Sequence, residues 1–306
     1  MQFRQLRYFV AVVEAGSISR AASVVHVAQP ALSQQIADLE DRIGVKLLLR
    51  TPRGVKPTPA GETFFREASL ILHRMDRLPG MLKSAIGEIQ GTVRLGIVAS
   101  LAAPMVGVIV EHFRSALPQV KLICSDGDSG TLVSRVQSHA LDLALVFEDE
   151  LGSTHSRTPI FAQEMFLIGK DAARIKTPHV SIDELAKIPL VSPGQQRNRR
   201  QLIDRAFAAR KLVPNIVTEV DNLSSELSAV RAGVGNTLLN VGELPDGFES
   251  FADPVPIKPP LVMTCCVIFS NEAALSAATE AVRASLIKVI KDFIKTSKRR
   301  GAKVID

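Results

Sequence analysis

Cysteine is scarce in this sequence of 306 residues, which contains only Cys124, Cys265 and Cys266. Two of the three are adjacent, and no Cys-x-x-Cys or Cys/His spacing of the kind that holds zinc is present. Three such thiols do not form a disulfide framework, so we expect them to lie buried on strands, where free cysteine is usually found. The sequence therefore predicts no metal site and no other cofactor.

Long apolar runs are also missing. No stretch of about 18 apolar residues could span a membrane, and the N-terminal residues lack the apolar core and cleavage site of a signal peptide. The composition is otherwise that of a globular protein, with 46% hydrophobic and 22% charged residues. We therefore expect a cytoplasmic protein of two or more lobes, without a membrane partner.

Negative charge is sparse at both ends of the chain. Residues 1–60 carry eight Lys/Arg against four Asp/Glu, and residues 286–306 carry seven against two. Since the net charge of the whole chain is +6, the middle is mildly acidic. This distribution indicates a polyanionic partner for the ends rather than for the body.

The first 58 residues predict three short helices and a two-stranded wing. Apolar residues recur at steps of three and four, which is typical of helices packed on a small core. Gly16 ends the first helix, Ser17 can cap the second, and the third begins at Gln29 and Pro30. The second and third helices are joined by a very short turn, and the third is polar at its N-terminal end. This arrangement is that of a helix-turn-helix.

Two further elements follow the third helix. Residues 47–57 predict the wing, from which Arg50, Arg53 and Lys56 would project. Residues 59–88 predict a long helix with an apolar stripe, and such a stripe usually packs against a copy of itself. Pro79 is expected to kink or divide that helix.

From residue 91 onward, short apolar strands alternate with helices. The segments 92–98, 120–125 and 141–147 are expected to be the parallel strands of a β-α-β-α-β unit. A second such unit follows, and a strand at 262–269 and a helix at 274–296 close the chain. Because the chain crosses over near residue 162 and returns near 266, the last helix can belong to the first unit. Two lobes joined in this way leave a cleft at the carboxyl ends of the strands.

Serine and threonine residues follow these strands at the positions where helices begin. Such positions offer N–H and hydroxyl donors, and the helix dipole favours an anion there. Each one alone is more often a helix cap than a ligand contact, but four of them converge on one cleft. We expect them to bind a small carboxylate: Ser100, Ser129, Thr131 and Ser192.

Two other patterns have alternative interpretations. The residues Gly127-Asp128-Ser129-Gly130 resemble the sequence around the nucleophile of chymotrypsin-like proteases, but no histidine pattern supports that chemistry and no catalytic residue is predicted. Arg197, Arg199 and Arg200 could counter a carboxylate, although a solvated charge run is the commoner outcome.

The stretch from Leu6 to Arg50 resembles the N-terminal domain of LysR-type transcriptional regulators, and the order of elements fits over the whole chain. The segments AQPALSQQ and RTPRGVKPT are most similar to those of the nitrogen assimilation control branch. Leu48 and Val25 depart from the usual Phe and Leu, which changes core volume, and Pro79 disturbs the linker helix. The matching elements are Phe9-Val10, Gly16-Ser17, Ala21-Ala22, Gln29-Pro30-Ala31-Leu32-Ser33, Ile36, Leu39-Glu40, Gly44, Leu47, Arg50 and Thr58-Pro59-Ala60-Gly61.

The resemblance implies that the third helix enters the major groove of DNA and that the wing reaches a minor groove. Gln29 and Gln34 can each offer a donor and an acceptor to a base edge, most naturally adenine. Ser33 can contact a base or a phosphate, and Pro30 a thymine methyl. Arg53 suits a narrow minor groove. The expected phosphate contacts are Ser17, Arg50 and Lys56.

The expected fold is α/β, with a winged helix-turn-helix (1–58), a linker helix (59–90) and a two-lobed effector domain like periplasmic binding proteins (91–306). Lobe I would comprise about 91–162 and 267–306, and lobe II about 163–266. The expected partners are double-stranded DNA, a small anionic effector, further copies of the chain as a homodimer or homotetramer, and RNA polymerase as a candidate.

Other classes of protein fit less well. A solute-binding transport protein would need an export signal and no helix-turn-helix, and an enzyme would need a catalytic constellation. One alternative stays open: a regulator of the same fold that is controlled by its abundance and has no effector.

Overall fold

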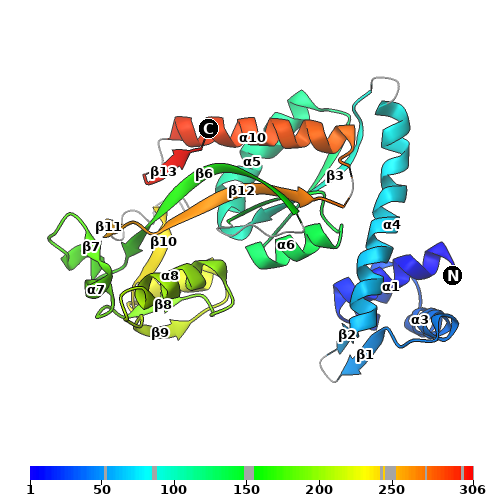
Figure 1. Ribbon diagram of the computed structural model, residues 1–306, viewed down its shortest axis with the longest axis horizontal. Coiled ribbons are helices and arrows are strands. Elements are labelled where there is room, and N and C mark those ends of the chain that lie inside the picture. Colours follow the sequence, from blue (N-terminus) through cyan, green and yellow to red (C-terminus); the bar gives the residue numbers. More distant parts are fainter. Residues whose placement is uncertain are drawn as a thin grey trace.

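The computed structural model describes residues 1–51, 54–84, 88–147, 155–241, 244, 253–272, 274–297 and 300–305. A small N-terminal domain sits at one end of a long helix, and a larger α/β domain extends away from that helix (Figure 1). Arg53, which was expected to project from the wing, lies outside the described residues.

Three helices and a wing form the N-terminal domain, as the sequence predicted. The helices are α1 (Phe3–Ala15), α2 (Ile18–Val24) and α3 (Gln29–Ile43), and the antiparallel strands β1 (Leu48–Thr51) and β2 (Gly54–Pro57) form the wing. Gly16 and Gly44, both in the left-handed conformation, end α1 and α3. The apolar faces meet in one small core, whose buried residues are Phe9, Val12, Ala21, Ala22, Leu32, Ile36, Leu39 and Leu47.

A buried carboxylate fastens the wing to α3. Glu40 accepts hydrogen bonds from the N–H groups of Leu47 (2.8 Å) and Leu48 (3.0 Å) and from Lys46 Nζ (2.8 Å). Burial alone would raise the pKa of Glu40, but these three donors hold that pKa below its usual value. The carboxylate is therefore ionised at neutral pH and fixes where the wing begins.

The linker helix α4 (Pro59–Ser84) runs through Pro79 without a break. Of the two expected effects of Pro79, a kink or a division of the helix, the division was wrong. A proline removes only one backbone hydrogen bond, here the bond to the carbonyl of Met75. Both residues are exposed, so water can satisfy that carbonyl and the helix continues.

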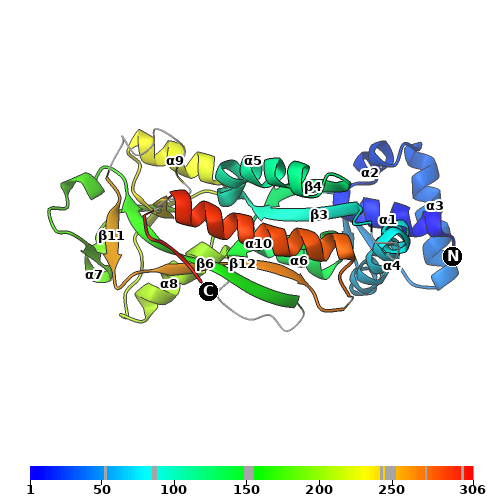
Figure 2. The same cartoon turned by 90° about the horizontal axis from the view of Figure 1, so that it is seen from above.

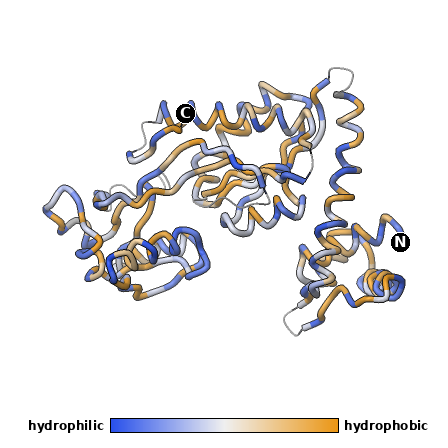
Figure 3. Tube along the Cα trace, in the orientation of Figure 1, coloured by the Kyte–Doolittle hydropathy of each residue, from blue (hydrophilic) through white to orange (hydrophobic). Residues whose placement is uncertain are grey.

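Lobe I is a mixed sheet covered on both faces. Strands β3 (Gly91–Val98), β4 (Val120–Gly127) and β5 (Leu143–Phe147) are parallel, as predicted, with β3 in the middle. Strand β12 (Val262–Ser270) is antiparallel to β5, and β6 (His155–Ile168) is antiparallel to β12. Helices α5 (Ala99–Ala116) and α10 (Ala277–Ser297) contact each other on one face, and α6 (Ser129–Gln137) contacts β5 and β12. Figure 3 shows the strands of this lobe as mostly hydrophobic.

Lobe II contains the second α/β unit. Strands β8 (Leu190–Ser192) and β9 (Ile216–Glu219) are parallel, and α8 (Asn198–Ala208) and α9 (Leu223–Ala232) follow them. Strands β10 (Thr237–Asn240) and β11 (Val255–Lys258) pair with β6, and β7 (Val180–Ser181) pairs with β11. A short 3-10 helix (Ala172–Arg174) and α7 (Ile182–Leu185) complete the lobe.

The two strands β6 and β12 connect the lobes, since each runs through lobe I toward lobe II (Figure 2). The predicted crossovers near 162 and 266 therefore lie inside continuous strands rather than in loops. Cys265 and Cys266 are buried on β12, as expected, and Cys124 is half-buried on β4, where burial raises the pKa of its thiol.

The last residues form a strand that the sequence did not predict. Strand β13 (Ala302–Val304) pairs with β6, and the Arg300 guanidinium stacks 5.0 Å from the ring centre of Phe166. The C-terminus lies far from the N-terminal domain in both Figure 1 and Figure 2. The two basic ends of one chain therefore do not form a common surface. Among the described residues, no helix is both long and apolar enough to cross a membrane.

Candidate nucleic-acid interface and interlobe cleft

The N-terminal turn of α3 is an open polar surface. Ala28 occupies the N-cap position without a side-chain cap, and Gln29 and Pro30 in the first turn are exposed. Gln34 is also exposed, but its amide donates to Asp38 Oδ1 at 2.8 Å. Within the described residues the Gln29 amide has no such partner, so both its donor and its acceptor are available to a base edge.

The wing lies against α3 and against the turn that follows α1. Arg50 Nη2 on β1 donates to Ser33 Oγ on α3 at 2.9 Å, so these two predicted contacts form one unit. The N–H of Val55 donates to Gly16 O at 2.9 Å, and a Cβ at Gly54 would come within 2.4 Å of that same oxygen. Only glycine fits at position 54. Lys56 on β2 is exposed and faces Leu49 across the hairpin.

Ser17 begins α2 beside this turn. It occupies the N-cap position, as predicted, but its side chain makes no capping hydrogen bond. Because Val55 of the wing bonds to the neighbouring Gly16, Ser17 lies next to the base of the wing.

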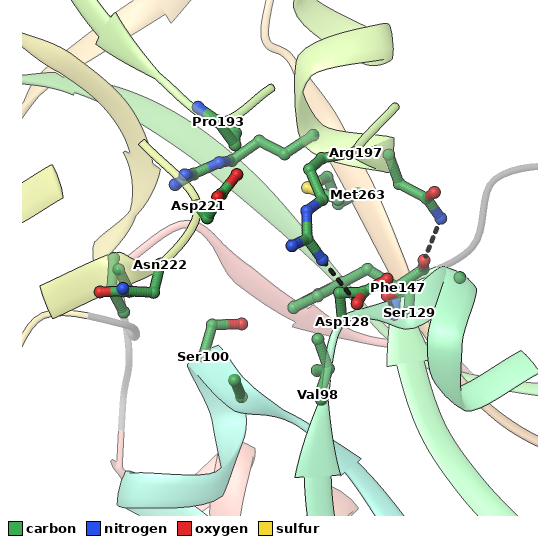
Figure 4. Close-up of a pocket in the computed structure, with 16 residues that line it drawn as sticks. Val98, Ser100, Asp128, Ser129, Phe147, Pro193, Arg197, Asp221, Asn222 and Met263 are labelled. Carbon is green, nitrogen blue, oxygen red and sulfur yellow. Dashed lines mark hydrogen bonds and ion pairs between the residues drawn. The ribbon is translucent and has the colours of Figure 1, made fainter. Parts of the chain in front are cut away.

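Between the lobes lies a cavity of about 380 Å³. Ligand cavities in proteins generally measure about 300–1,000 Å³, so this one suits a small metabolite. Lobe I contributes the ends of β3, β4 and β5 with the starts of α5 and α6, and lobe II contributes the starts of α8 and α9 (Figure 4). The lining residues include Val98, Ser100, Asp128, Ser129, Phe147, Arg197, Asn198, Arg199, Asp221, Asn222, Leu223 and Met263.

Two contacts close this cleft. The Arg197 guanidinium of lobe II pairs with the Asp128 carboxylate of lobe I at 2.5 Å, and Asn198 Nδ2 donates to Phe147 O at 3.0 Å (Figure 4). Burial alone would raise the pKa of Asp128, but hydrogen bonds from Thr131 and Arg197 hold it below its usual value. The interlobe ion pair is therefore charged at neutral pH.

The four residues expected to bind a carboxylate occupy different places. Ser100 and Ser129 line the cavity, and Ser129 Oγ accepts a hydrogen bond from the N–H of Phe147 at 3.2 Å. The Thr131 hydroxyl donates to Asp128 at 2.6 Å and lines an adjoining hollow. Ser192 is buried next to the cavity-lining Pro193 but is not itself a lining residue.

The three arginines at the start of α8 are not a solvated charge run, so that interpretation was wrong. Besides the Arg197–Asp128 pair, Arg199 pairs with the buried Glu226, which also accepts from the Thr237 hydroxyl. Arg200 is buried and pairs with Asp204 and Glu219. Packing of α8 within lobe II brings carboxylates to Arg199 and Arg200, of which Glu226 is buried whereas Asp204 and Glu219 are partly exposed.

Several residues of the cleft escaped the sequence analysis. Asp128 sits inside the motif Gly127-Asp128-Ser129-Gly130, in which only the hydroxyl of Ser129 was predicted to contact a ligand. Its place before a helix, where it caps α6 by accepting from the N–H of Thr131 at 3.0 Å, is a signal that the sequence offers. Asn198, Asp221 and Met263 gave no local signal.

No group of three or more His, Cys, Asp or Glu side chains is placed to hold a metal ion in the described part of the chain.

Comparisons with known proteins agree with this architecture. Residues 3–62 match the bacterial regulatory helix-turn-helix protein, lysR family, and residues 87–291 match the LysR substrate binding domain. The nitrogen assimilation regulatory protein nac of Escherichia coli (strain K12) is 30% identical over 240 residues, which cover 78% of each chain. The resemblance to that branch, seen in the sequence, is thereby confirmed.

Solved structures share the fold. A full-length OxyR from Pseudomonas aeruginosa superimposes with a TM-score of 0.67 at 19% identity, covering 99% of this chain and 98% of that one. A full-length CbnR in complex with its target DNA gives a TM-score of 0.63 at 20% identity, covering 93% and 100%. With its helix-turn-helix, its two-lobed substrate-binding domain and relatives that are regulators rather than enzymes, the chain belongs to the LysR family of bacterial transcriptional regulators.

Proposed function

We propose that this regulator responds to a small carboxylate bound in the cavity between its two lobes. The observation that carries the proposal is the interlobe ion pair. Among the described residues it is the one ion pair that joins the lobes, and both of its side chains line the cavity and are about one-third exposed. A ligand carboxylate that pairs with Arg197 would replace the Asp128 carboxylate, and the contacts that set the lobe angle would change.

Donors on the lobe I side support the same proposal. Helix α5 begins at Ala99 and presents its first turn, with Ser100, to the cavity. The first N–H groups of a helix have no partner within the helix, and the dipole favours a negative charge beside them. A carboxylate could therefore contact α5 of lobe I and Arg197 of lobe II at the same time.

The DNA-contacting residues are proposed to act in two groups. Gln29, Pro30 and Gln34 face the base edges, whereas Ser17, Arg50 and Lys56 contact phosphates. Ser33 is assigned to the phosphate side, because its hydroxyl already accepts a hydrogen bond from Arg50. Since the partner is chromosomal DNA, we place the protein in the cytoplasm.

A ligand screen on the full chain tests the effector. A ligand at 100 times its dissociation constant stabilises the native state by about 2.7 kcal/mol, and each kcal/mol moves the melting temperature of a domain of this size by about 2–4 °C. We expect at least one compound in a broad panel of metabolic carboxylates, amino acids included, to raise the melting temperature by about 5–11 °C. A panel without any shift would favour the regulator controlled by abundance.

We further propose that α4 pairs with the α4 of a second copy. Ile71, Met75, Leu78 and Leu82 recur at steps of four and three, and all four are exposed. Pairing along this stripe would give a twofold-symmetric dimer with two copies of α3, which a palindromic DNA site requires.

The double variant Ile71→Asp with Leu78→Asp tests this pairing, because it places like charges on the stripe. Light scattering is expected to show a smaller species than for the parent chain. Glu62→Asp, an exposed change at the start of the same helix, is the control and should leave the mass unchanged. An unchanged mass of the double variant would mean that copies associate through another surface.

A further inference from the structure

We infer that the ligand of the interlobe cavity carries a positively charged amino group beside its carboxylate. This inference rests on the proposed effector site and narrows the class of compound that the site accepts. It comes from the charges that line the cavity, taken together with the partners that each charge already has.

The cavity has more carboxylates than its arginines can balance. Two arginines line it, Arg197 and Arg199, and each already has a carboxylate partner, Asp128 and Glu226 respectively. A further carboxylate, Asp221, also lines the cavity. Asp221 is exposed, and among the described residues it has no hydrogen bond or ion pair. It lies just before α9 on the lobe II wall (Figure 4).

The Arg199 pair cannot release its arginine for Asp221. Glu226 is buried, with its side chain 1% exposed, and the Thr237 hydroxyl binds its second oxygen. Removal of Arg199 would leave a charged carboxylate buried without a cation, which is strongly unfavourable. Arg199 is therefore committed to Glu226, and the exposed carboxylate of Asp221 remains available to a positive charge on the ligand.

A ligand with carboxylates alone would make this imbalance worse. Its carboxylate would take Arg197 away from Asp128, so that Asp128 and Asp221 would both face the ligand without a cation. Like charges that share a site repel one another, and a ligand that displaces water from these two carboxylates would also take away part of their hydration. An ammonium group on the same ligand would supply the partner for both carboxylates.

The two kinds of partner lie on suitable sides of the cavity. Asp128, Asp221 and Arg197 line both the main cavity and the adjoining hollow, whereas Ser100 lines only the main cavity. A ligand can therefore direct its carboxylate to α5 and Arg197 and its ammonium to the boundary between the two hollows. The rest of the wall combines the polar side chains of Ser129, Asn198 and Asn222 with an apolar part, which consists of Val98, Phe147, Leu223 and Met263 among others. These features together match a free amino acid with a short side chain.

Matched pairs of compounds test this inference on the full chain. The probes are the proteinogenic L-amino acids and, for each that raises the melting temperature, the 2-hydroxy acid with the same side chain. Diamines without a carboxylate and simple dicarboxylates complete the set. We expect an amino acid to bind about tenfold to a hundredfold more tightly than its 2-hydroxy acid, the range typical for a hydrogen bond to a charged group.

A substitution then assigns the effect to its residue. Asp221→Asn should bring the affinities for the amino acid and its 2-hydroxy acid within about threefold of each other, because the amide keeps the shape but not the charge. Asp292→Asn, an exposed change on α10 outside this cavity, should keep the original preference. The melting temperatures without ligand verify that both variants are folded.

The possible outcomes separate the two proposals. Equal or tighter binding of hydroxy acids or dicarboxylates by the parent chain overturns the amino-group inference and leaves the effector site standing. If diamines are the only compounds that bind, the proposal that the effector carries a carboxylate is contradicted. If no compound of any class changes the melting temperature, the effector site itself fails and this inference fails with it.

Discussion

Replacement of His73 by alanine is expected to lower the melting temperature of the full chain by about 6–20 °C. His73 on α4 lies 2.6 Å from Asp142 through its Nε2, and the two side chains are only 6% and 1% exposed. Loss of one member of a buried pair costs about 3–5 kcal/mol, because the other is left without its partner. Each kcal/mol corresponds to about 2–4 °C in a domain of this size.

The remaining contacts of Asp142 cannot compensate for the loss. Its other carboxylate oxygen already accepts a hydrogen bond from the N–H of Arg94 at 2.7 Å. His73 also stacks on His139, with ring centres 6.0 Å apart, so alanine would leave a gap in the same place. The substitution therefore removes a hydrogen bond and a packing contact together.

Calorimetry of three variants checks this result. His73→Gln keeps a donor that can reach Asp142 and is expected to lose less than half as much stability as His73→Ala. Glu67→Ala, at an exposed position of the same helix, should shift the melting temperature by no more than about 2 °C, since an exposed ion pair contributes about 0–1 kcal/mol. If His73→Ala and His73→Gln lowered the melting temperature equally, the hydrogen bond to Asp142 would contribute nothing to stability.

The junction of α4 with lobe I also lies on the strands that reach the cleft. Asp142 directly precedes β5, whose last residue Phe147 lines the cavity. Arg94 lies on β3, which ends at the cavity with Val98, and it also pairs with Asp76 of α4 at 2.9 Å. Two strands thus connect contacts of α4 directly to the cavity wall.

The sequence alone predicts those elements whose structure depends on residues that are close together along the chain. The helix-turn-helix, the wing and the parallel strands of lobe I follow from apolar spacing, glycine stops and turn residues, which act over a few positions. The predicted span of α9, 223–232, agrees with the helix observed. The third helix and the exposed Gln29 in its first turn could be placed in the same way.

Pairs that are distant in the sequence could not be predicted. His73 and Asp142 are 69 residues apart, and Asp128 and Arg197 meet only because the lobes face each other across a cleft. No periodicity marks such partners, so the arginines near 197 looked like a solvated run. The strand β13 was missed for a related reason: its three residues become a strand only by pairing with β6.

Replacement of Gln29 by alanine is expected to weaken binding to the specific DNA site by about 1–3 kcal/mol per half-site, while binding to random DNA stays unchanged. The Gln29 amide is exposed in the first turn of α3 and has no partner among the described residues. A bidentate contact from such an amide to a base edge contributes about this much discrimination. The specific site is obtained beforehand by selection from random oligonucleotides with the parent protein.

Lys56→Ala is the matched comparison, because Lys56 is exposed on the wing and is proposed to contact a phosphate of the DNA backbone. Loss of the Lys56 side chain should weaken binding to specific and to random DNA by the same factor. It should also reduce the slope of log affinity against log salt by about one per half-site. Arg50 is less suitable for this purpose, since it also binds Ser33. Fluorescence anisotropy at several salt concentrations measures both variants on both DNAs. If Gln29→Ala weakened binding to specific and random DNA equally, α3 would contact phosphates rather than bases. If the salt dependence of binding were unchanged in Lys56→Ala, the wing would lie away from the DNA.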